Sequence, residues 1–300
     1  MNNFTYINFK KERELGEIIS DTFAFIKQNY KVLFEIFVKV LWPVLVLMAL
    51  AVGYYTYATL YLSEDFTTVV NNSGNDIMDN LMNFYSGMFL ASLVLVLASW
   101  FYYSLMYGAY QYAVQSYIQN KGNIKIDEVI QGVKDNWTGF LGLSFLSWLL
   151  VLIGFFMCIL PGIYISIPFS LLFSIMVFKQ KGVSESISYS FTLIKGNWWI
   201  TFFTFFVISL IYGLIGFVFD LPALLYTLVK GFIMGTSGTL SDPDFMFDWV
   251  YLTLSILGSF AKYLLYPIIV IGTIFMFFNL NEKKNQTGTF ETIDSLGNNE

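Results

Sequence analysis

Charged residues inside apolar segments are the first candidates for chemistry in this sequence. Glu35 and Lys39 lie four residues apart in one such segment, and Asp220 and Lys262 lie in two others. Ionisable groups within a hydrocarbon layer are costly, so they usually pair, line a water-filled cavity or take part in transport. Glu35 and Lys39 share one helical face and can pair with each other, so a structural or snorkelling pair is the simpler interpretation.

Lys262 is the most informative of these charges, because it lies about 14 residues past Asp248, well inside the last apolar segment. An unpaired lysine at the centre of a span costs roughly 2.5–3.5 kcal/mol on insertion scales. We therefore predict that Lys262 pairs with Asp220. The sequence leaves two interpretations open, a structural pair and a role in transport or ligand binding.

Other kinds of chemistry are excluded by residue usage. The chain has no histidine and one cysteine, Cys158. This excludes His-based zinc sites, Ser-His and Cys-His nucleophile pairs, and an intramolecular disulfide. No Walker A motif or glycine-rich phosphate loop is present. We therefore predict no catalytic residues, no cofactor, no metal site and no enzymatic activity.

The elements that must position these charges are membrane spans. Of 300 residues, 56% are apolar, 20% are aromatic and only 12% are charged, too few for the shell of a soluble domain of this size. Several apolar runs can cross a hydrocarbon layer of roughly 30 Å. We predict an all-α polytopic membrane bundle. Its six spans cover about residues 32–62, 85–118, 139–160, 163–178, 200–219 and 249–280.

An amphipathic pattern recurs before three pairs of spans. Within residues 184–199, apolar side chains recur at i, i+4, i+7 and i+11, which places them on one helical face. The three copies of this stripe are Ile187, Phe191, Ile194 and Trp198; Ile19, Phe23, Ile26 and Tyr30; and Ile126, Ile130, Val133 and Trp137. The pattern predicts three units of amphipathic helix plus membrane hairpin, at about 15–118, 126–178 and 184–280. They form one membrane domain, 1–280, after which a polar cytoplasmic tail, 281–300, has a composition compatible with disorder.

Each copy also carries a Lys-x-Asn motif where the helix meets its span. The motifs are Lys27 and Asn29, Lys134 and Asn136, and Lys195 and Asn197. The asparagine indicates a helix break or cap. The lysine suits the headgroup zone, where its attraction to anionic lipid contributes about 1 kcal/mol. Trp198 fits an interfacial anchor. The apolar stripes either dock on the inner leaflet or pack against the protein's own spans.

Prolines predict where the spans bend or turn. Pro43 predicts a kink in the first span. The sixth span is longer than a bilayer requires, so we expect it to be tilted, kinked at Pro267 or protruding. Pro161-Gly162 predicts a tight turn between the third and fourth spans. Pro222 stands 27 residues after Lys195, the same spacing that separates Pro161 from Lys134, which indicates that the second and third units share their length.

The distribution of lysine and arginine predicts the orientation. Thirteen of the sixteen fall in the N-terminal region, in 119–137, in 179–197 or in the tail. The predicted loops 63–84 and 231–248 contain none. Because cytoplasmic segments carry the excess of positive charge, we expect both termini and all three amphipathic helices on the cytoplasmic side.

Two segments resemble a known family. LPGIYISIPFSLLFSIMVFKQKGVSESISYSFTLIKGNWWITF, residues 160–202, and LGEIISDTFAFIKQN, residues 15–29, are similar to the glycerophosphoryl diester phosphodiesterase membrane-domain family and its YciC-like relatives. The resemblance covers most of the chain and implies a multi-span bacterial inner-membrane protein. In some bacterial proteins this membrane domain precedes a soluble phosphodiesterase barrel. Only 20 residues follow the last predicted span, so we do not expect that activity here.

These observations lead to two functional expectations. The first is a non-enzymatic scaffold, assembly or envelope-maintenance component, whose partners are the lipid bilayer and other membrane or cytoplasmic proteins rather than nucleic acid. The alternative is a transporter or lipid-handling protein with a cavity near Lys262. Internal repeats favour the alternative. The absence of a span with a string of polar residues opposes it, and a closed, apolar-packed bundle would oppose it further.

Overall fold

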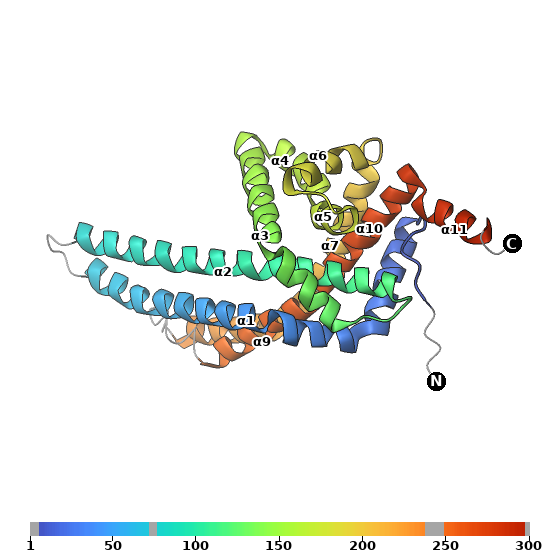
Figure 1. Cartoon of the computed structure of the whole chain (residues 1–300). Helices are drawn as coiled ribbons and strands as arrows, with labels where there is room; N and C mark the ends of the chain where they lie inside the picture. Colours follow the sequence, from blue (N-terminus) through green and yellow to red (C-terminus); the bar gives the residue numbers. More distant parts are fainter. Residues whose placement is uncertain (1–5, 72–76, 238–248, 298–300) are drawn as a thin grey trace.

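The computed structural model describes residues 6–71, 77–237 and 249–297 of the chain. The protein is 90% helical, and the described residues contain no strand. Six of its helical segments are long and apolar enough to cross a membrane. The chain is therefore an all-α polytopic membrane bundle, as the hydropathy pattern predicts (Figure 1).

The first unit is a long antiparallel pair formed by α1 (Leu15–Asn71) and α2 (Ile77–Gln119) (Figure 1). With 57 residues at about 1.5 Å each, α1 is roughly 85 Å long, far more than a bilayer core requires. The predicted loop at 63–84 is wrong in its described part, because residues 63–71 and 77–84 belong to these two helices. No proline or glycine falls between Gly53 and Gly74, so nothing in that segment ends α1 early.

The second unit contains α3 (Ile126–Met157), α4 (Ile159–Phe169) and α5 (Leu172–Lys179). The chain turns at Cys158, whose backbone is extended, and not at Pro161-Gly162 as predicted. These two residues lie in the first turn of α4, where a proline removes no helical hydrogen bond. A Cβ added at Gly162 would lie 2.5 Å from Cγ of Phe155, so this glycine lets α3 and α4 approach closely.

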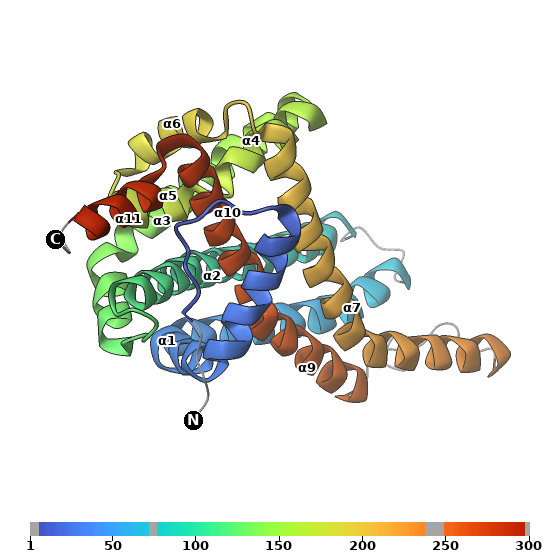
Figure 2. The ribbon, with the colours of Figure 1, turned by 90° about the vertical axis from the view of Figure 1, so that its right-hand side faces the viewer.

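The third unit contains α6 (Val183–Ile194), α7 (Trp198–Ser237), α9 (Trp249–Leu265) and α10 (Pro267–Asn285). Pro222 lies inside α7, which bends sharply along its length in Figure 2. Pro161 and Pro222 thus occupy different structural positions despite their matched spacing. The predicted loop at 231–248 is wrong for residues 231–237, which belong to α7; residues 238–248 lie outside the described residues.

Of the alternatives for the sixth span, the structure shows the one at Pro267, because the helix is interrupted at Tyr266 and α10 begins at this proline. The polar tail differs from the prediction. Residues 281–285 complete α10, and residues 287–297 form α11 (Thr287–Gly297). At the other terminus, residues 6–14 form an irregular arm ahead of α1.

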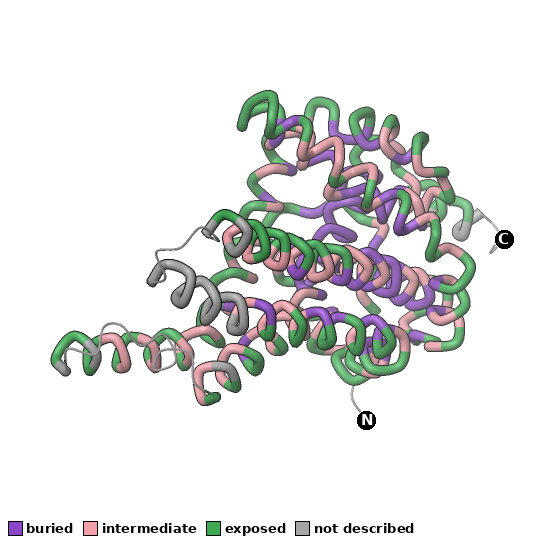
Figure 3. Tube along the Cα trace, turned by 90° about the vertical axis from the view of Figure 1, so that its left-hand side faces the viewer, coloured by how far each residue is buried: buried purple, intermediate pink, exposed green. Residues whose placement is uncertain are grey.

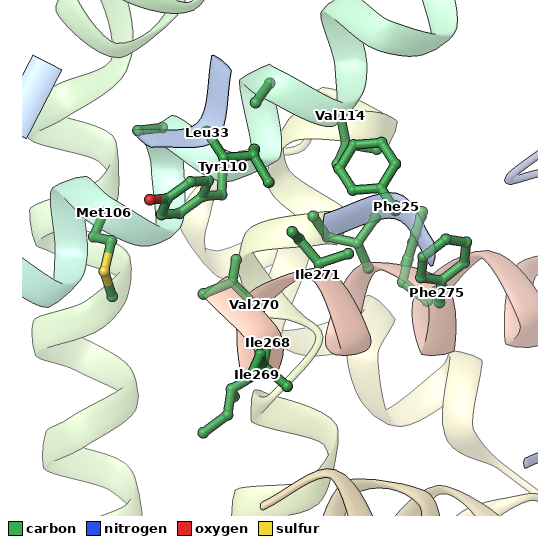
Figure 4. Packing of buried hydrophobic residues seen from close by; sticks show 14 of the residues in the cluster. Phe25, Leu33, Met106, Tyr110, Val114, Ile268, Ile269, Val270, Ile271 and Phe275 are labelled. Atoms are coloured by element: carbon green, nitrogen blue, oxygen red, sulfur yellow. The ribbon is translucent and has the colours of Figure 1, made fainter. Parts of the chain in front are cut away.

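The centre of the bundle is α10. All sixteen residues from Pro267 to Glu282 are buried, and α1, α2, α5, α6 and α7 pack around them. Buried positions concentrate in the middle of the molecule in Figure 3. Figure 4 shows Ile271 and Phe275 of α10 close to Phe25 of α1 and Val114 of α2. A helix that is apolar on every side is stable only when it is surrounded, and here protein surrounds it.

Both chain termini lie at one end of the molecule, opposite the end where α1 finishes and α2 begins (Figure 1). An even number of spans brings the chain back to its starting side. The arrangement therefore agrees with six crossings of a membrane.

Candidate functional site

The predicted pair of Lys262 and Asp220 is confirmed. Lys262 Nζ lies 2.9 Å from Oδ1 and 3.0 Å from Oδ2 of Asp220. Two glycines allow this contact by bringing α7 and α9 together. A Cβ added at Gly258 would lie 2.8 Å from the carbonyl oxygen of Phe219, and one at Gly216 would lie 3.4 Å from the Lys262 side chain. The lysine methylenes thus lie over Gly216 while the ammonium reaches the carboxylate.

This ion pair lies at the rim of the bundle. The Lys262 and Asp220 side chains are 34% and 45% exposed from the protein, so neither is enclosed by other helices. The hydroxyl of Tyr212 donates a hydrogen bond to the backbone oxygen of Lys262 at 3.4 Å. The pair can therefore neutralise two charges within an apolar layer, with a tyrosine beside it.

A cluster of tyrosines extends from this pair into the bundle. Its members are Tyr102, Tyr103, Tyr107, Tyr212, Tyr263 and Tyr266, whose rings contact one another in pairs with centroids 4.9–6.3 Å apart. Tyr102 is fully buried, and its hydroxyl has no hydrogen-bond partner among the described residues. The sequence shows the tyrosines of α2 as a dense group but does not indicate that those of α7 and α9 join them.

The pair of Glu35 and Lys39 is also confirmed, with Lys39 Nζ 2.7 Å from Oε1 of Glu35. Both side chains point outward from α1, and they are 42% and 56% exposed. A pair of this kind, one helical turn apart and outside the bundle, matches the structural interpretation.

The predicted helix break at the asparagine of each repeat is right only in the third copy. There α6 ends at Ile194 and α7 begins at Trp198, so Asn197 lies in the break. Asn29 and Asn136 instead lie within α1 and α3. The Asn29 side chain donates to the backbone oxygen of Phe25 at 2.9 Å, and that of Asn136 donates to the Tyr112 hydroxyl at 2.8 Å.

The reason for this difference is one residue. Gly196 precedes Asn197 and has φ of +84°, a left-handed conformation that glycine adopts without steric cost. Gln28 and Asp135 occupy the equivalent positions in the other two copies. Side chains with a Cβ disfavour that conformation, so the first two amphipathic segments continue into their spans.

The buried face of the repeats is displaced from the predicted stripe. In α6 the buried residues are Ser186, Ser190, Leu193 and Ile194, whereas Phe191 of the stripe is exposed. The equivalent positions of α1 behave in the same way. Three of them are buried, Ile18, Thr22 and Phe25, and Ile26 is half-buried. The repeats therefore pack one face on the protein. Their lysines, Lys27, Lys134 and Lys195, are exposed.

Trp198, predicted as an interfacial anchor, ties the start of α7 to α4. Its ring stacks on Tyr164 with centroids 5.5 Å apart, and its Nε1–H donates to the Tyr164 backbone oxygen at 3.2 Å. These contacts hold α7 against the second unit. The anchoring role at a membrane surface stays a prediction.

Arg13 is the polar residue that sequence reasoning missed. Its side chain is fully buried, with Nε 2.8 Å from Oδ2 of Asp21 and Nη1 2.8 Å from the backbone oxygen of Phe9. The guanidinium lies 4.7 Å from the ring centroid of Phe275, and the Arg13 backbone N–H donates to Oδ1 of Asn279 at 2.9 Å. Burial lowers the pKa of Arg13, while the hydrogen bond and charge of Asp21 oppose that change.

Arg13 fastens the N-terminal arm to both α1 and the central helix α10. The signal in the sequence is that it is the only arginine in the chain. Arginine suits a buried site better than lysine because its planar group is weakly hydrated and can bond several acceptors at once.

Glu282 similarly fixes the C-terminal segment. This buried carboxylate accepts the Gly288 N–H at 2.8 Å and also the Thr287 hydroxyl, and Lys10 of the arm contacts Glu291 of α11 at 2.5 Å. The arm, the end of α10 and α11 thus form one folded cap where the termini meet.

A hollow of about 280 Å³ lies between the end of α2 and the start of α3. Its polar lining includes Gln115, Gln119, Glu128, Gln131, Asp135 and Asn136. Because all of its lining residues belong to α2 and α3, this hollow does not reach Lys262 on α9.

Comparisons with known proteins do not identify the chain: no family model, no curated protein and no solved structure matches it. The resemblance to the glycerophosphoryl diester phosphodiesterase membrane-domain family therefore stays a prediction.

Proposed function

We propose that this protein is a non-enzymatic component of the bacterial inner membrane, acting as a scaffold or in assembly or envelope maintenance. The observation that carries the proposal is the enclosure of α10. Sixteen consecutive residues are buried in the middle of the bundle, where their apolar side chains fill the space. A path for a substrate needs an opening lined by polar groups, so a filled centre favours a structural role.

The end of the molecule that carries the termini is the surface we propose for partners. It bears the folded cap of arm and α11, and most of the lysines lie in the segments gathered there. This asymmetry supports a cytoplasmic location for both termini and for the repeats. The partners we propose are the lipid bilayer and membrane or cytoplasmic proteins, and not nucleic acid.

Orientation is tested by labelling single cysteines with a membrane-impermeant maleimide in a Cys158→Ser background. Glu12 and Thr236 are both exposed and lie in segments assigned to opposite sides. In intact spheroplasts, T236C should react and E12C should react only after the membrane is permeabilised. The reverse pattern would contradict the proposed orientation.

The scaffold role is tested by recovering the full-length protein from native membranes in mild detergent and quantifying what accompanies it. We expect at least one partner in stoichiometric amount. Reversing the exposed charges at Lys27, Lys134 and Lys195 to glutamate should reduce its recovery, whereas Lys230→Glu, in α7 near the opposite end, serves as the matched control. Recovery of no stoichiometric partner would contradict the scaffold proposal.

The alternative is a transporter or lipid-handling protein, and the partly exposed pair of Lys262 and Asp220 is the observation that favours it. The test is solute flux and lipid scrambling in proteoliposomes. Movement that is lost in Lys262→Met and retained in Lys39→Met would replace the scaffold proposal with this one. No movement above that of empty vesicles would remove the alternative.

A further inference from the structure

The polar hollow between α2 and α3 is a feature that neither the ion pairs nor the scaffold proposal explains. The two helices run antiparallel there, joined by residues 120–125, and the hollow opens where the span of α2 ends at Gln119. Because the second span is predicted to end at about residue 118 and residues 119–137 are predicted to face the cytoplasm, we expect the hollow at the depth of lipid headgroups. The inference does not depend on the proposed function.

The shape of the hollow is built by specific contacts. A Cβ added at Gly132 would lie 2.6 Å from Cδ1 of Tyr112, so the absence of a side chain leaves room for the tyrosine ring. The Asn136 amide donates to the Tyr112 hydroxyl at 2.8 Å and holds that ring in place. These residues form a fixed side of the hollow.

A second side is held by Glu128. Its Oε2 accepts hydrogen bonds from Ser116 Oγ at 2.6 Å and from Asn120 Nδ2 at 2.8 Å. Its Oε1 lies 3.2 Å from Lys125 Nζ, so the nearest lysine in the connection is already engaged. The carboxylate is therefore fixed in position while still contributing negative potential to the hollow.

The remaining lining groups are free to bind a ligand. Gln115, Gln119 and Gln131 make no hydrogen bond within the described residues, and the exposed carboxylate of Asp135 makes no ion pair there. Amide and carboxylate oxygens are acceptors, and none of the lining residues is a cation. The best match is a compact cation with several N–H donors, which is a primary ammonium group.

We propose that this hollow binds a primary ammonium group, carried by a lipid headgroup or by a small free amine. A quaternary ammonium has no N–H to donate and is larger, so it binds more weakly. An anionic headgroup meets two carboxylates and binds more weakly still.

The test measures binding to the full-length protein in detergent by native mass spectrometry, with phosphatidylethanolamine, phosphatidylcholine and phosphatidylglycerol as probes. We expect at least tenfold preference for phosphatidylethanolamine over the other two. Free ethanolamine is the second probe. If it binds alone and displaces the lipid, the natural ligand is a free amine; if it does neither, the ammonium group that binds belongs to a lipid headgroup. Equal retention of the three lipids with no binding of ethanolamine would overturn the proposal.

Two variants on one helix sharpen the result. Asp135→Asn removes the free carboxylate and should lower the binding of the amine probe about tenfold. Asp127→Asn removes another exposed acid of α3 that does not line the hollow, and its binding should not change. Both positions are exposed, so both variants should keep the melting temperature of the parent. Equal binding by the two variants would overturn the assignment.

Discussion

Single residues in this protein are placed by the cost of leaving a polar group without a partner in an apolar layer. Lys262 and Asp220 meet across α7 and α9, and Glu35 meets Lys39 along α1. Arg13 is surrounded by acceptors and an aromatic ring. Tyr102 is the exception among the described residues, because its buried hydroxyl has no partner.

The pair of Lys262 and Asp220 gives the first prediction. Lys262→Met or Asp220→Asn should each lower the free energy of unfolding by about 1–3 kcal/mol, because the remaining group is left unpaired in an apolar layer. The double variant should lose less than the sum of the two singles. Thermal or denaturant unfolding in detergent measures this, with Lys39→Met, whose side chain lies outside the bundle, expected to cost less than either single variant. If the losses of the two single variants add up to that of the double variant, Lys262 and Asp220 are not energetically coupled.

The hydroxyl of Tyr102 gives the second prediction. Tyr102→Phe should leave stability unchanged or raise it by about 1 kcal/mol, because an unpaired buried hydroxyl is removed. Tyr117→Phe is the contrasting variant. The Tyr117 hydroxyl accepts the Ile7 N–H at 3.0 Å, so its loss should destabilise the protein by about 1 kcal/mol. Similar losses in both variants would mean that Tyr102 has a partner in the membrane.

At the scale of elements, three copies of one motif adopt different structures, and a single glycine in the third copy accounts for the difference. Lys-x-Asn occurs three times, but only Lys195-Gly196-Asn197 ends a helix. The other two copies run on into α1 and α3. A break in this position sets α6 apart as a separate helix against α4, α5 and α10.

Substitution at that glycine gives the third prediction. Gly196→Ala should lower the free energy of unfolding by about 1–2 kcal/mol, because φ of +84° is unfavourable for any residue with a Cβ. Gly142→Ala is the control within α3, where an added Cβ meets nothing within 4 Å. It should stabilise the protein by about 0.5–1 kcal/mol. Unfolding in detergent measures both, and changes of the same sign would contradict this explanation of the break.

The whole molecule is organised around α10, with both ends of the chain folded over the end of that helix. Phe9 of the arm stacks on Phe275 with centroids 4.3 Å apart, and Arg13 lies over the same ring. Glu282 holds the start of α11. The stability of the bundle is therefore coupled to the order of its terminal segments.

Removing the arginine gives the fourth prediction. Arg13→Met should lower the free energy of unfolding by about 2 kcal/mol, because the bonds to Asp21 and to the arm are lost together. The arm should also become the first site of limited proteolysis. Lys11→Met is the control, since its exposed side chain lies 3.7–3.8 Å from its carboxylate partners and should contribute little. An arm that stays protected in Arg13→Met would contradict the anchoring role.

Local signals in the sequence were sufficient for the parts of the structure that depend on local forces. Hydropathy predicted six spans, proline predicted the interruption before Pro267, and the cost of an unpaired charge predicted the contact of Lys262 with Asp220. The amphipathic periods correctly predicted helices, but the asparagine marked the end of a helix only in the third copy. That boundary depended on the left-handed conformation at Gly196.

Tertiary structure decided which apolar helix is central and which segments cover it. Hydropathy cannot distinguish α10 from α7, because lipid tails and neighbouring helices are equally apolar surroundings for a side chain. Burial of Arg13 and Glu282 likewise depends on contacts of the arm and the tail with the end of α10. The sequence determined by itself that the chain crosses a membrane as helices, since that follows from the transfer of each segment out of water. The packing of those helices decided the enclosed α10, the cap and the hollow beside Asp135, because these arise from contacts between residues far apart in the chain.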